Sequence, residues 1–128
     1  MRPIATLSIL LVMLAATHPA LADGDAEAGK KVFTRCAACH DGKTEKNRVG
    51  PYLVGVVGRK AASVEGFKYS AAMTEAGAGG LVWDEPNLTE YLRAPKAKVP
   101  GGSMAFPGLK KDEDIANVIA WLKADPKP

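Results

Sequence analysis

Hydrophobic residues recur at helical spacing in two segments that lie far apart in the chain. Near the C-terminus four of them follow the pattern i, i+3, i+4 and i+7: Ile115, Val118, Ile119 and Leu122. This spacing places them on one side of a helix. The acidic run from Asp112 to Asp114 comes just before them and suits the positive N-terminal end of a helix. The pattern predicts a helix over residues 112–122.

The second segment lies near the beginning of the chain, at residues 26–36. Its small and apolar residues also keep to one helical face: Ala26, Gly29, Val32, Phe33 and Cys36. Gly29 has no side chain beyond its Cα, so another helix could cross close to it. We therefore expect a helix here as well.

Two shorter stretches between these segments also indicate helices. "DEPNLTEYLRAP", residues 84–95, begins with Asp84 as a plausible N-cap, has Pro86 in its first turn and is ended by Pro95. The side chains expected to face inward are Leu88, Tyr91 and Leu92. "YSAAMTEAG", residues 69–77, is a short helical stretch. Neither strand-like alternation nor an internal repeat is evident, so the predicted fold class is all-α.

The first 22 residues read as a targeting segment rather than as part of the fold. Arg2 is followed by an apolar run, residues 4–16, and by the small-x-small pattern Ala20-Leu21-Ala22. These features are typical of a secretory signal that is removed before Asp23. The alternative is an uncleaved anchor, but the run is too short, and too often interrupted by polar residues, for a membrane span. We expect residues 1–22 to be removed and residues 23–128 to form one exported periplasmic domain without stable membrane insertion.

Composition and charge exclude some classes of function. The formal net charge of the chain is only +3, and no base-reading motif is visible, so a nucleic-acid partner is not expected. The sequence contains three Phe, three Tyr and two Trp against thirteen Gly. A bound apolar cofactor would therefore help to account for the core of so small a domain.

The stretch "RCAACHDG" contains both cysteines of the chain, Cys36 and Cys39, followed directly by His40. A disulfide between them would close a very small loop and gain little stability. A zinc site would need more ligands, because His40 is the only histidine outside residues 1–22 and there is no third cysteine. A thioredoxin-like dithiol would require alternating strands and helices. None of these uses is favoured.

The remaining interpretation is C-x-x-C-H, the attachment motif of c-type haem. Each thiol adds across a vinyl group of the porphyrin to form a thioether. The spacing of Cys36 and Cys39 places both sulfurs on one helical face. His40 then follows at a position from which its imidazole reaches the iron. The sequence thus predicts one covalent haem c, held by Cys36 and Cys39, with His40 as an axial ligand.

Two methionines outside the targeting segment could bind the other side of the iron. Met104 lies in "VPGGSMAFPG", where prolines and glycines exclude regular structure. Met73 lies in the short helical stretch, where a thioether is expected to fill a gap in the core. We favour Met104 as the second axial ligand, and Met73 is the alternative.

With these residues in place, the sequence resembles class I cytochrome c. The resemblance is to the exported bacterial cytochrome c2 type, which is related to mitochondrial cytochrome c. Its motifs follow in order as "GKKVF", "CAACH", "GPYLVGVVGRKAA", "GFKYS", Trp83, "LTEYLRAPK", "VPGGSMAFPG" and "IANVIAWL". The match covers nearly all of residues 23–128. It implies the class I cytochrome c fold, in which the first and last helices cross and the haem lies in the core.

The resemblance also implies roles for residues around the haem. Pro51 resembles the residue whose carbonyl accepts a hydrogen bond from His40 and raises the basicity of the imidazole. Tyr69 and Trp83 resemble donors to a buried haem propionate. Arg59 is expected nearby, where its charge lowers the cost of burying that carboxylate.

Further roles and departures concern the residues near the predicted methionine ligand. Tyr91 resembles the aromatic residue beside the sulfur, and Phe106 the one that shields the haem edge. Gly102 stands where relatives often have a threonine, so a hydroxyl near the propionate is missing or comes from Ser103. Met73 stands where mitochondrial relatives have an asparagine. The segment "TEAGAGGLV", residues 74–82, is about three residues longer than in those relatives and is expected to be a surface loop.

A haem with both axial positions filled offers no place for a substrate, so the predicted function is electron transfer without substrate turnover. The resemblance implies a carrier of single electrons between membrane redox complexes. Its donor would be a bc1-type complex, and its acceptor a photosynthetic reaction centre or a terminal oxidase. The alternative is a haem-based redox or gas sensor with a labile methionine ligand.

The distribution of charge indicates how such a carrier would meet its partners. Residues 91–111 contain five cations and no acidic residue: Arg93, Lys96, Lys98, Lys110 and Lys111. Arg35 adds positive charge beside the predicted haem site. We expect a monomer whose docking face, formed by Arg35, Lys96, Lys98, Lys110 and Lys111, is attracted to redox proteins with acidic surfaces.

Overall fold

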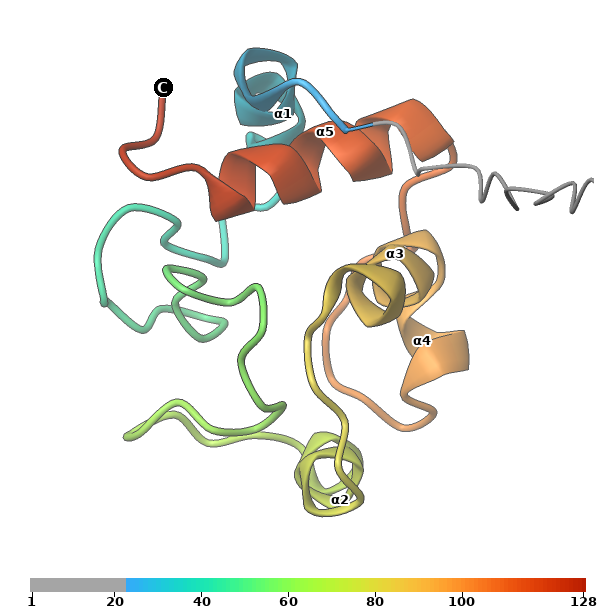
Figure 1. Cartoon of the computed structure of the whole chain (residues 1–128). Coiled ribbons are helices and arrows are strands. Elements are labelled where there is room, and N and C mark those ends of the chain that lie inside the picture. Colours follow the sequence, from blue (N-terminus) through green and yellow to red (C-terminus); the bar gives the residue numbers. More distant parts are fainter. Residues whose placement is uncertain (1–22) are drawn as a thin grey trace, which may run out of the picture.

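The computed structural model describes residues 23–128, so the predicted signal segment, residues 1–22, lies outside the described part. Within that part the chain forms helices and connecting loops (Figure 1): α1 (Ala26–Phe33), α2 (Ala71–Ala78), α3 (Glu85–Arg93), α4 (Pro95–Lys98) and α5 (Asp112–Lys123). The only strand-like pairing among these residues is an isolated antiparallel bridge between Lys60 and Val82. The predicted all-α class is confirmed.

Helices α1 and α5 cross in close contact, as Figure 1 shows at the top of the molecule. The crossing depends on Gly29, because a Cβ atom there would lie 1.9 Å from the carbonyl oxygen of Asn117. Gly24 approaches α5 just as closely, since a Cβ atom on it would lie 2.1 Å from the carbonyl oxygen of Ala116. The buried side chain of Asn117 accepts a hydrogen bond from the backbone N–H of Asp25 at 2.8 Å. The first and last helices are thus packed backbone against backbone.

The predicted apolar face of α5 is buried, and the buried surface is wider than the spacing indicated. The four predicted residues are nearly inaccessible: Ile115, Val118, Ile119 and Leu122. Trp121 is also buried, and its ring lies 4.3 Å from that of Phe33 on α1. Gly42 passes beneath this indole, where a Cβ would lie 2.6 Å from the ring. The core therefore includes the start of the loop that follows the cysteine motif.

Helix α1 is shorter than its sequence pattern predicts, because it ends at Phe33 rather than reaching Cys36. The hydroxyl of Thr34 donates a hydrogen bond to the carbonyl of Lys31, in competition with the regular helical pattern. Residues 34–39 continue as hydrogen-bonded turns. The prediction that Cys36 and Cys39 share a regular helix is therefore wrong, although the chain still coils tightly through both.

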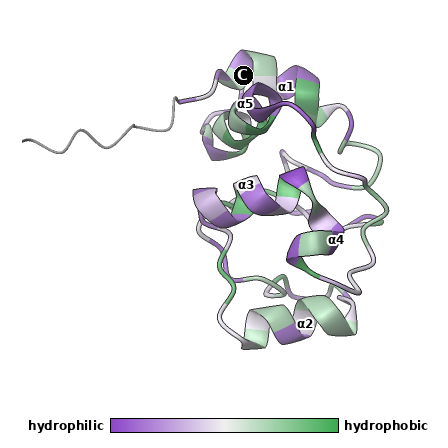
Figure 2. Ribbon diagram, turned by 90° about the vertical axis from the view of Figure 1, so that its right-hand side faces the viewer, coloured by the Kyte–Doolittle hydropathy of each residue, from purple (hydrophilic) through white to green (hydrophobic). Residues whose placement is uncertain are grey.

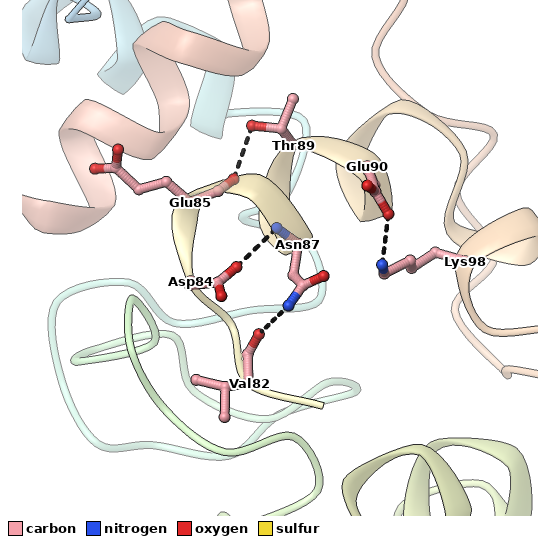
Figure 3. A network of polar contacts seen from close by, with 7 residues as sticks. All are labelled: Val82, Asp84, Glu85, Asn87, Thr89, Glu90 and Lys98. Carbon is pink, nitrogen blue, oxygen red and sulfur yellow. Dashed lines mark hydrogen bonds and ion pairs between the residues drawn. The ribbon is translucent and has the colours of Figure 1, made fainter. Parts of the chain in front are cut away.

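Helix α3 begins and ends where the sequence predicts. Figure 3 shows the carboxylate of Asp84 accepting a hydrogen bond from the backbone N–H of Asn87, at 2.9 Å, which caps the first turn. The amide of Asn87 reaches back to the carbonyl of Val82. Pro95 ends this helix and opens α4, a short helix that the sequence pattern did not predict.

Helix α2 lies at the end of the molecule opposite the α1–α5 pair, and Figure 2 shows it mostly green, with few hydrophilic positions. The side chain of Ser70 caps it by accepting from the N–H of Met73. Gly77 packs so tightly that a Cβ would lie 2.3 Å from the carbonyl oxygen of Ala61. The surface loop expected for residues 74–82 is therefore a wrong prediction for residues 74–78, which are helical. No helix in residues 23–128 is long and apolar enough to span a bilayer.

Candidate functional site

A largely apolar cavity of about 310 Å³ lies between the loops that follow the cysteine motif and helices α2 and α3. Five side chains with metal- or porphyrin-binding chemistry line it: Cys36, Cys39, His40, Met73 and Met104. Figure 1 shows the segments that contribute to it, with residues 40–70 on one side and α3 and the loop after α4 on the other. The fold thus brings together two parts of the chain that the sequence separates by more than sixty positions.

The cysteine turn presents both thiols to this cavity. The backbone N–H groups of Cys39 and His40 both donate to the carbonyl of Cys36, at 3.1 and 2.9 Å, so the turn is tightly coiled. Cys36 is half-buried, and this burial raises the pKa of its thiol. Cys39 is exposed. Neither sulfur is tied up in a disulfide.

The imidazole of His40 is held on two sides. Its Nδ1 lies 2.7 Å from the carbonyl oxygen of Pro51, which can only accept, so Nδ1 carries the proton and Nε2 keeps its lone pair. Gly50 lies against the ring, because a Cβ there would be 2.3 Å from Cε1 of His40. Burial lowers the pKa of His40, and the neutral form is the one that binds a metal.

The thioether of Met104 is held by one hydrogen bond from the described residues. The hydroxyl of Tyr91, on α3, donates to its sulfur at 3.8 Å. Burial raises the pKa of this tyrosine, which keeps the hydroxyl proton in place. The ring of Tyr91 lies 4.7 Å from that of Trp83, which is buried. Met73 lines the same cavity from α2.

Arg59 places a cation beside the cavity without an acidic partner. Its guanidinium donates to the carbonyls of Val54 and Tyr52, at 3.2 and 3.0 Å, and lies over the ring of Tyr52. No ion pair to Arg59 is present within residues 23–128. Burial lowers the pKa of Arg59, because its charge is poorly solvated. An anionic group on a bound cofactor would compensate this charge.

Tyr69 also lines the cavity. Its hydroxyl oxygen accepts from the backbone N–H of Val64 at 3.1 Å, and its proton remains available. Phe106 also lines the cavity, and it lies between this cavity and a second, shallower hollow that includes Lys96.

Among the cavity-lining residues that were not predicted from the sequence, Gly50 and Val49 are the most informative. Gly50 is the first residue of the motif "GPYLVGVVGRKAA". Nothing in the sequence around it indicates that the absence of a side chain there makes room for the imidazole of His40. Val49 lines the cavity and is 78% exposed, the one exposed large hydrophobic residue in the described chain. A large apolar residue between Arg48 and Gly50 in a polar loop is the only signal that could have indicated it.

The predicted docking cations differ in how free they are. Arg35 is exposed at the rim of the cavity, and Lys96, Lys110 and Lys111 are exposed as well. Lys98 forms an ion pair with Glu90 of α3 (Figure 3), and its side chain is only 23% exposed. This pairing removes Lys98 from the free positive charge that the sequence indicated.

Comparison with known proteins agrees with this arrangement. The sequence profile of the family named Cytochrome c matches residues 26–124. The chain belongs to the cytochrome c family. It is 48% identical over 118 residues to cytochrome c-554 of Methylosinus trichosporium, covering 91% of this chain and 87% of the relative.

Further relatives are of the cytochrome c2 type. Cytochrome c2 of Rhodoblastus acidophilus is 52% identical over 106 residues, covering 80% of this chain and 96% of the relative. Among solved structures, cytochrome cH from Methylobacterium extorquens has a TM-score of 0.72 at 46% identity, covering 78% of this chain and 98% of that one. The resemblance to class I bacterial cytochrome c2 and its fold is confirmed.

As a member of this family, the chain carries one covalent haem c with its iron, attached through Cys36 and Cys39. The cavity fits such a group: its lining is mostly apolar, two thiols and an imidazole lie at one wall, and an arginine without an acidic partner in residues 23–128 lies beside it. No group of three or more His, Cys, Asp and Glu residues in positions 23–128 is placed to hold a separate metal ion. The protein is a c-type cytochrome of the electron-carrier family.

Proposed function

We propose that this cytochrome carries single electrons between membrane redox complexes, with His40 and Met104 as the two axial ligands of its haem iron. The observation that carries the proposal is the convergence of an imidazole lone pair and a thioether, far apart in the sequence, on one cavity. When bound, the haem supplies an iron that cycles between the ferrous and ferric states. With both axial positions filled there is no site for a substrate, so the protein turns over none.

The residues of the chain each contribute to this function through a fixed group. The Pro51 carbonyl accepts a hydrogen bond from Nδ1–H of His40, which orients the imidazole and makes it a stronger donor to iron. The Tyr91 hydroxyl donates to the Met104 sulfur and withdraws electron density from it. Arg59, Tyr69 and Trp83 offer the positive charge and donors suited to propionate carboxylates. Phe106 covers the edge of the cavity.

The cellular role follows from the proposed export. Residues 1–22 are proposed to direct the chain to the periplasm and to be removed, which leaves residues 23–128 as the working monomer. The donor is proposed to be a bc1-type complex, and the acceptor a reaction centre or terminal oxidase. The exposed cations Arg35, Lys96, Lys110 and Lys111 would attract the acidic faces of these partners, with Lys98 contributing less because of Glu90.

The ligand assignment is tested by removing each thioether in turn. Met104→Ala in the holoprotein should abolish the absorption band of sulfur-to-iron ligation and let an added ligand such as cyanide bind rapidly. Met73→Ala is the matched control, because it removes a thioether from the same cavity, and it should keep the band. If the band disappears in Met73→Ala and survives in Met104→Ala, the axial ligand is Met73 and the proposal is wrong.

The docking proposal is tested by ionic strength. The rate of reduction by a purified bc1-type complex should fall as salt rises, since charged surfaces steer the encounter within a Debye length of about 10 Å at 0.1 M salt. Lys96→Ala should lower the low-salt rate, whereas Lys98→Ala should lower it less because Lys98 is already paired with Glu90. A rate that does not depend on salt would refute electrostatic steering.

A second candidate function, a redox or gas sensor, is favoured by one observation. The Met104 sulfur is held by a single weak hydrogen bond at 3.8 Å from the described residues, so its ligation could be reversible. Binding of carbon monoxide to the resting ferrous protein at neutral pH would support this function. A ferrous protein that does not bind carbon monoxide would support the electron carrier.

A further inference from the structure

The loop that follows His40 leaves the cysteine turn and returns to it, and Asp41 holds both its ends. The carboxylate of Asp41 accepts hydrogen bonds at 2.8 Å from the backbone N–H groups of Lys43 and Thr44. It also accepts from the hydroxyl of Thr44 at 2.8 Å. The carbonyl of Asp41 accepts from the N–H of Leu53, also at 2.8 Å. One residue therefore fixes how the loop departs and where it comes back.

The returning part of the loop contains both groups that touch the imidazole of His40. Gly50 lies against the ring, and its N–H donates to the carbonyl of Cys39 at 2.8 Å. The carbonyl oxygen of Pro51 accepts a hydrogen bond from Nδ1 at 2.7 Å. The position of these two residues decides the length of the hydrogen bond to His40.

Arg48 ties this returning segment to the cysteine turn. Its backbone N–H donates to the carbonyl of Gly50 at 2.9 Å. Its guanidinium reaches across and donates to the carbonyl of Ala37, between the two cysteines, also at 2.9 Å. Arg48 thus connects the segment that holds the imidazole to the segment that holds the thiols, and its charge alone would have marked it as a docking residue.

We propose that Asp41 and Arg48 are positioning residues for His40, acting through the Gly50–Pro51 segment. The proposal rests on the proposed function, in which His40 is an axial ligand. Neither side chain bonds to the imidazole, and their effect passes through the Pro51 carbonyl. If the loop loosens, the hydrogen bond from Nδ1 weakens and the imidazole becomes a poorer donor to ferric iron. The reduction potential then rises.

The test compares two substitutions of Asp41 in the holoprotein. Asp41→Asn removes the charge but keeps an oxygen that accepts from Lys43 and Thr44, whereas Asp41→Ala removes both. Loss of the negative charge raises the potential equally in both variants. The proposal expects a further rise in Asp41→Ala alone, together with exchange of the His40 Nδ1 proton about tenfold faster, measured by NMR in the ferrous state. Equal potentials and equal exchange rates in the two variants would overturn the role of Asp41.

A second pair tests Arg48 and remains informative if Asp41→Ala does not assemble. Lys46→Ala is the matched control, because Lys46 is an exposed cation of the same loop whose side chain forms no hydrogen bond or ion pair within residues 23–128. Both Arg48→Ala and Lys46→Ala remove one positive charge and so lower the potential. Arg48→Ala should nevertheless keep the higher potential of the two and show faster exchange of the Nδ1 proton. If the two variants match, Arg48 has no positioning role.

The wild-type spectrum separates failure of this inference from failure of the proposed function. If the wild-type iron is not six-coordinate and low-spin with a histidine ligand, the proposed function is wrong. If it is, and the paired variants do not differ, only the positioning roles of Asp41 and Arg48 are wrong.

Discussion

The two walls of the cavity hold the proposed iron ligands, His40 and Met104, in different ways. On the His40 side, the imidazole is fixed by the Pro51 carbonyl at 2.7 Å and by contact with Gly50. The loop behind it is itself held by the carboxylate of Asp41 and the guanidinium of Arg48. This wall is a polar framework built from short hydrogen bonds.

On the Met104 side, the loop is anchored at its ends and little braced between them. Val99 and Leu109 are buried at either end, and the N–H of Leu109 donates to the carbonyl of Leu92 at 2.8 Å. Between these anchors, the side chain of Met104 receives from the described residues only the hydroxyl of Tyr91, at 3.8 Å. The sulfur is placed by hydrophobic anchoring of the loop rather than by direct bonds.

The difference indicates that the protein fixes the proposed His40 ligand more firmly than the proposed Met104 ligand. An imidazole that is already fixed loses little conformational entropy when it binds iron, whereas the Met104 side chain, with a single hydrogen bond from the described residues, would lose more as the proposed ligand. We therefore expect the methionine side to open first under stress and the histidine side to persist.

The largest expected effect comes from closing the space beside the imidazole. Gly50→Ala would place a Cβ 2.3 Å from Cε1 of His40, so the ring must rotate and lose its hydrogen bond to Pro51. We expect the holoprotein to be destabilised by about 1–3 kcal/mol, with a lower thermal midpoint and a lower yield.

Gly102→Ala is the matched control on the opposite wall. Its Cβ would lie 3.1 Å from the carbonyl oxygen of Val99, a tight contact that a shift of a few tenths of an ångström can relieve. Its effect should stay below about 1 kcal/mol. If Gly102→Ala proves as damaging as Gly50→Ala, the two walls are equally rigid and the contrast between them fails.

A similar effect is expected at the anchor of the methionine loop. Gly108 has a φ of 108°, and a Cβ there would lie 2.1 Å from the carbonyl oxygen of Arg93. Gly108→Ala should destabilise the folded loop by about 1–3 kcal/mol. The sulfur-to-iron band should then disappear at a lower temperature than the Soret band. Gly58→Ala is the control, since its φ is also positive but nothing lies near its Cβ position. Simultaneous loss of both bands in Gly108→Ala would contradict the expected order of opening.

The smallest expected effect concerns the polar contact to the sulfur. Tyr91→Phe removes the hydroxyl 3.8 Å from the Met104 sulfur, a bond worth less than about 1 kcal/mol at that distance. The sulfur then becomes a better donor, ferric iron is favoured, and the reduction potential should fall slightly. Voltammetry measures this shift. A rise in potential would show that the hydroxyl does not polarise the sulfur.

Much of the local structure could be predicted because it depends on neighbours in the chain. Asp84 caps α3, Pro95 ends it, and the apolar positions of α5 are buried, since each of these features needs only residues three or four positions away. Helix α1 stops early because of an equally local competitor, the Thr34 hydroxyl, which hydrophobic periodicity does not register.

The composition of the candidate site was predictable in part for the same reason. The motif from Cys36 to His40 is short, and its thiols and imidazole line one cavity, as the spacing predicted. That Met104 joins them was expected from its loop and from the family resemblance, and its ligation remains a prediction. The free charge of the docking face was not predictable, because Lys98 is paired with Glu90, eight residues earlier on another helix.

Residue type and short-range spacing were enough to predict four of the five described helices and the haem-attachment motif, and the family resemblance implied the class of the protein. Contacts between distant segments required the folded chain: Gly50 against the imidazole, Asn117 bonded to Asp25, and the Arg59 guanidinium bonded to backbone carbonyls. The physical reason is that a spacing rule describes periodic local geometry, whereas these contacts depend on where loops of irregular conformation return in space. That return path is decided by packing and hydrogen bonding over the whole domain.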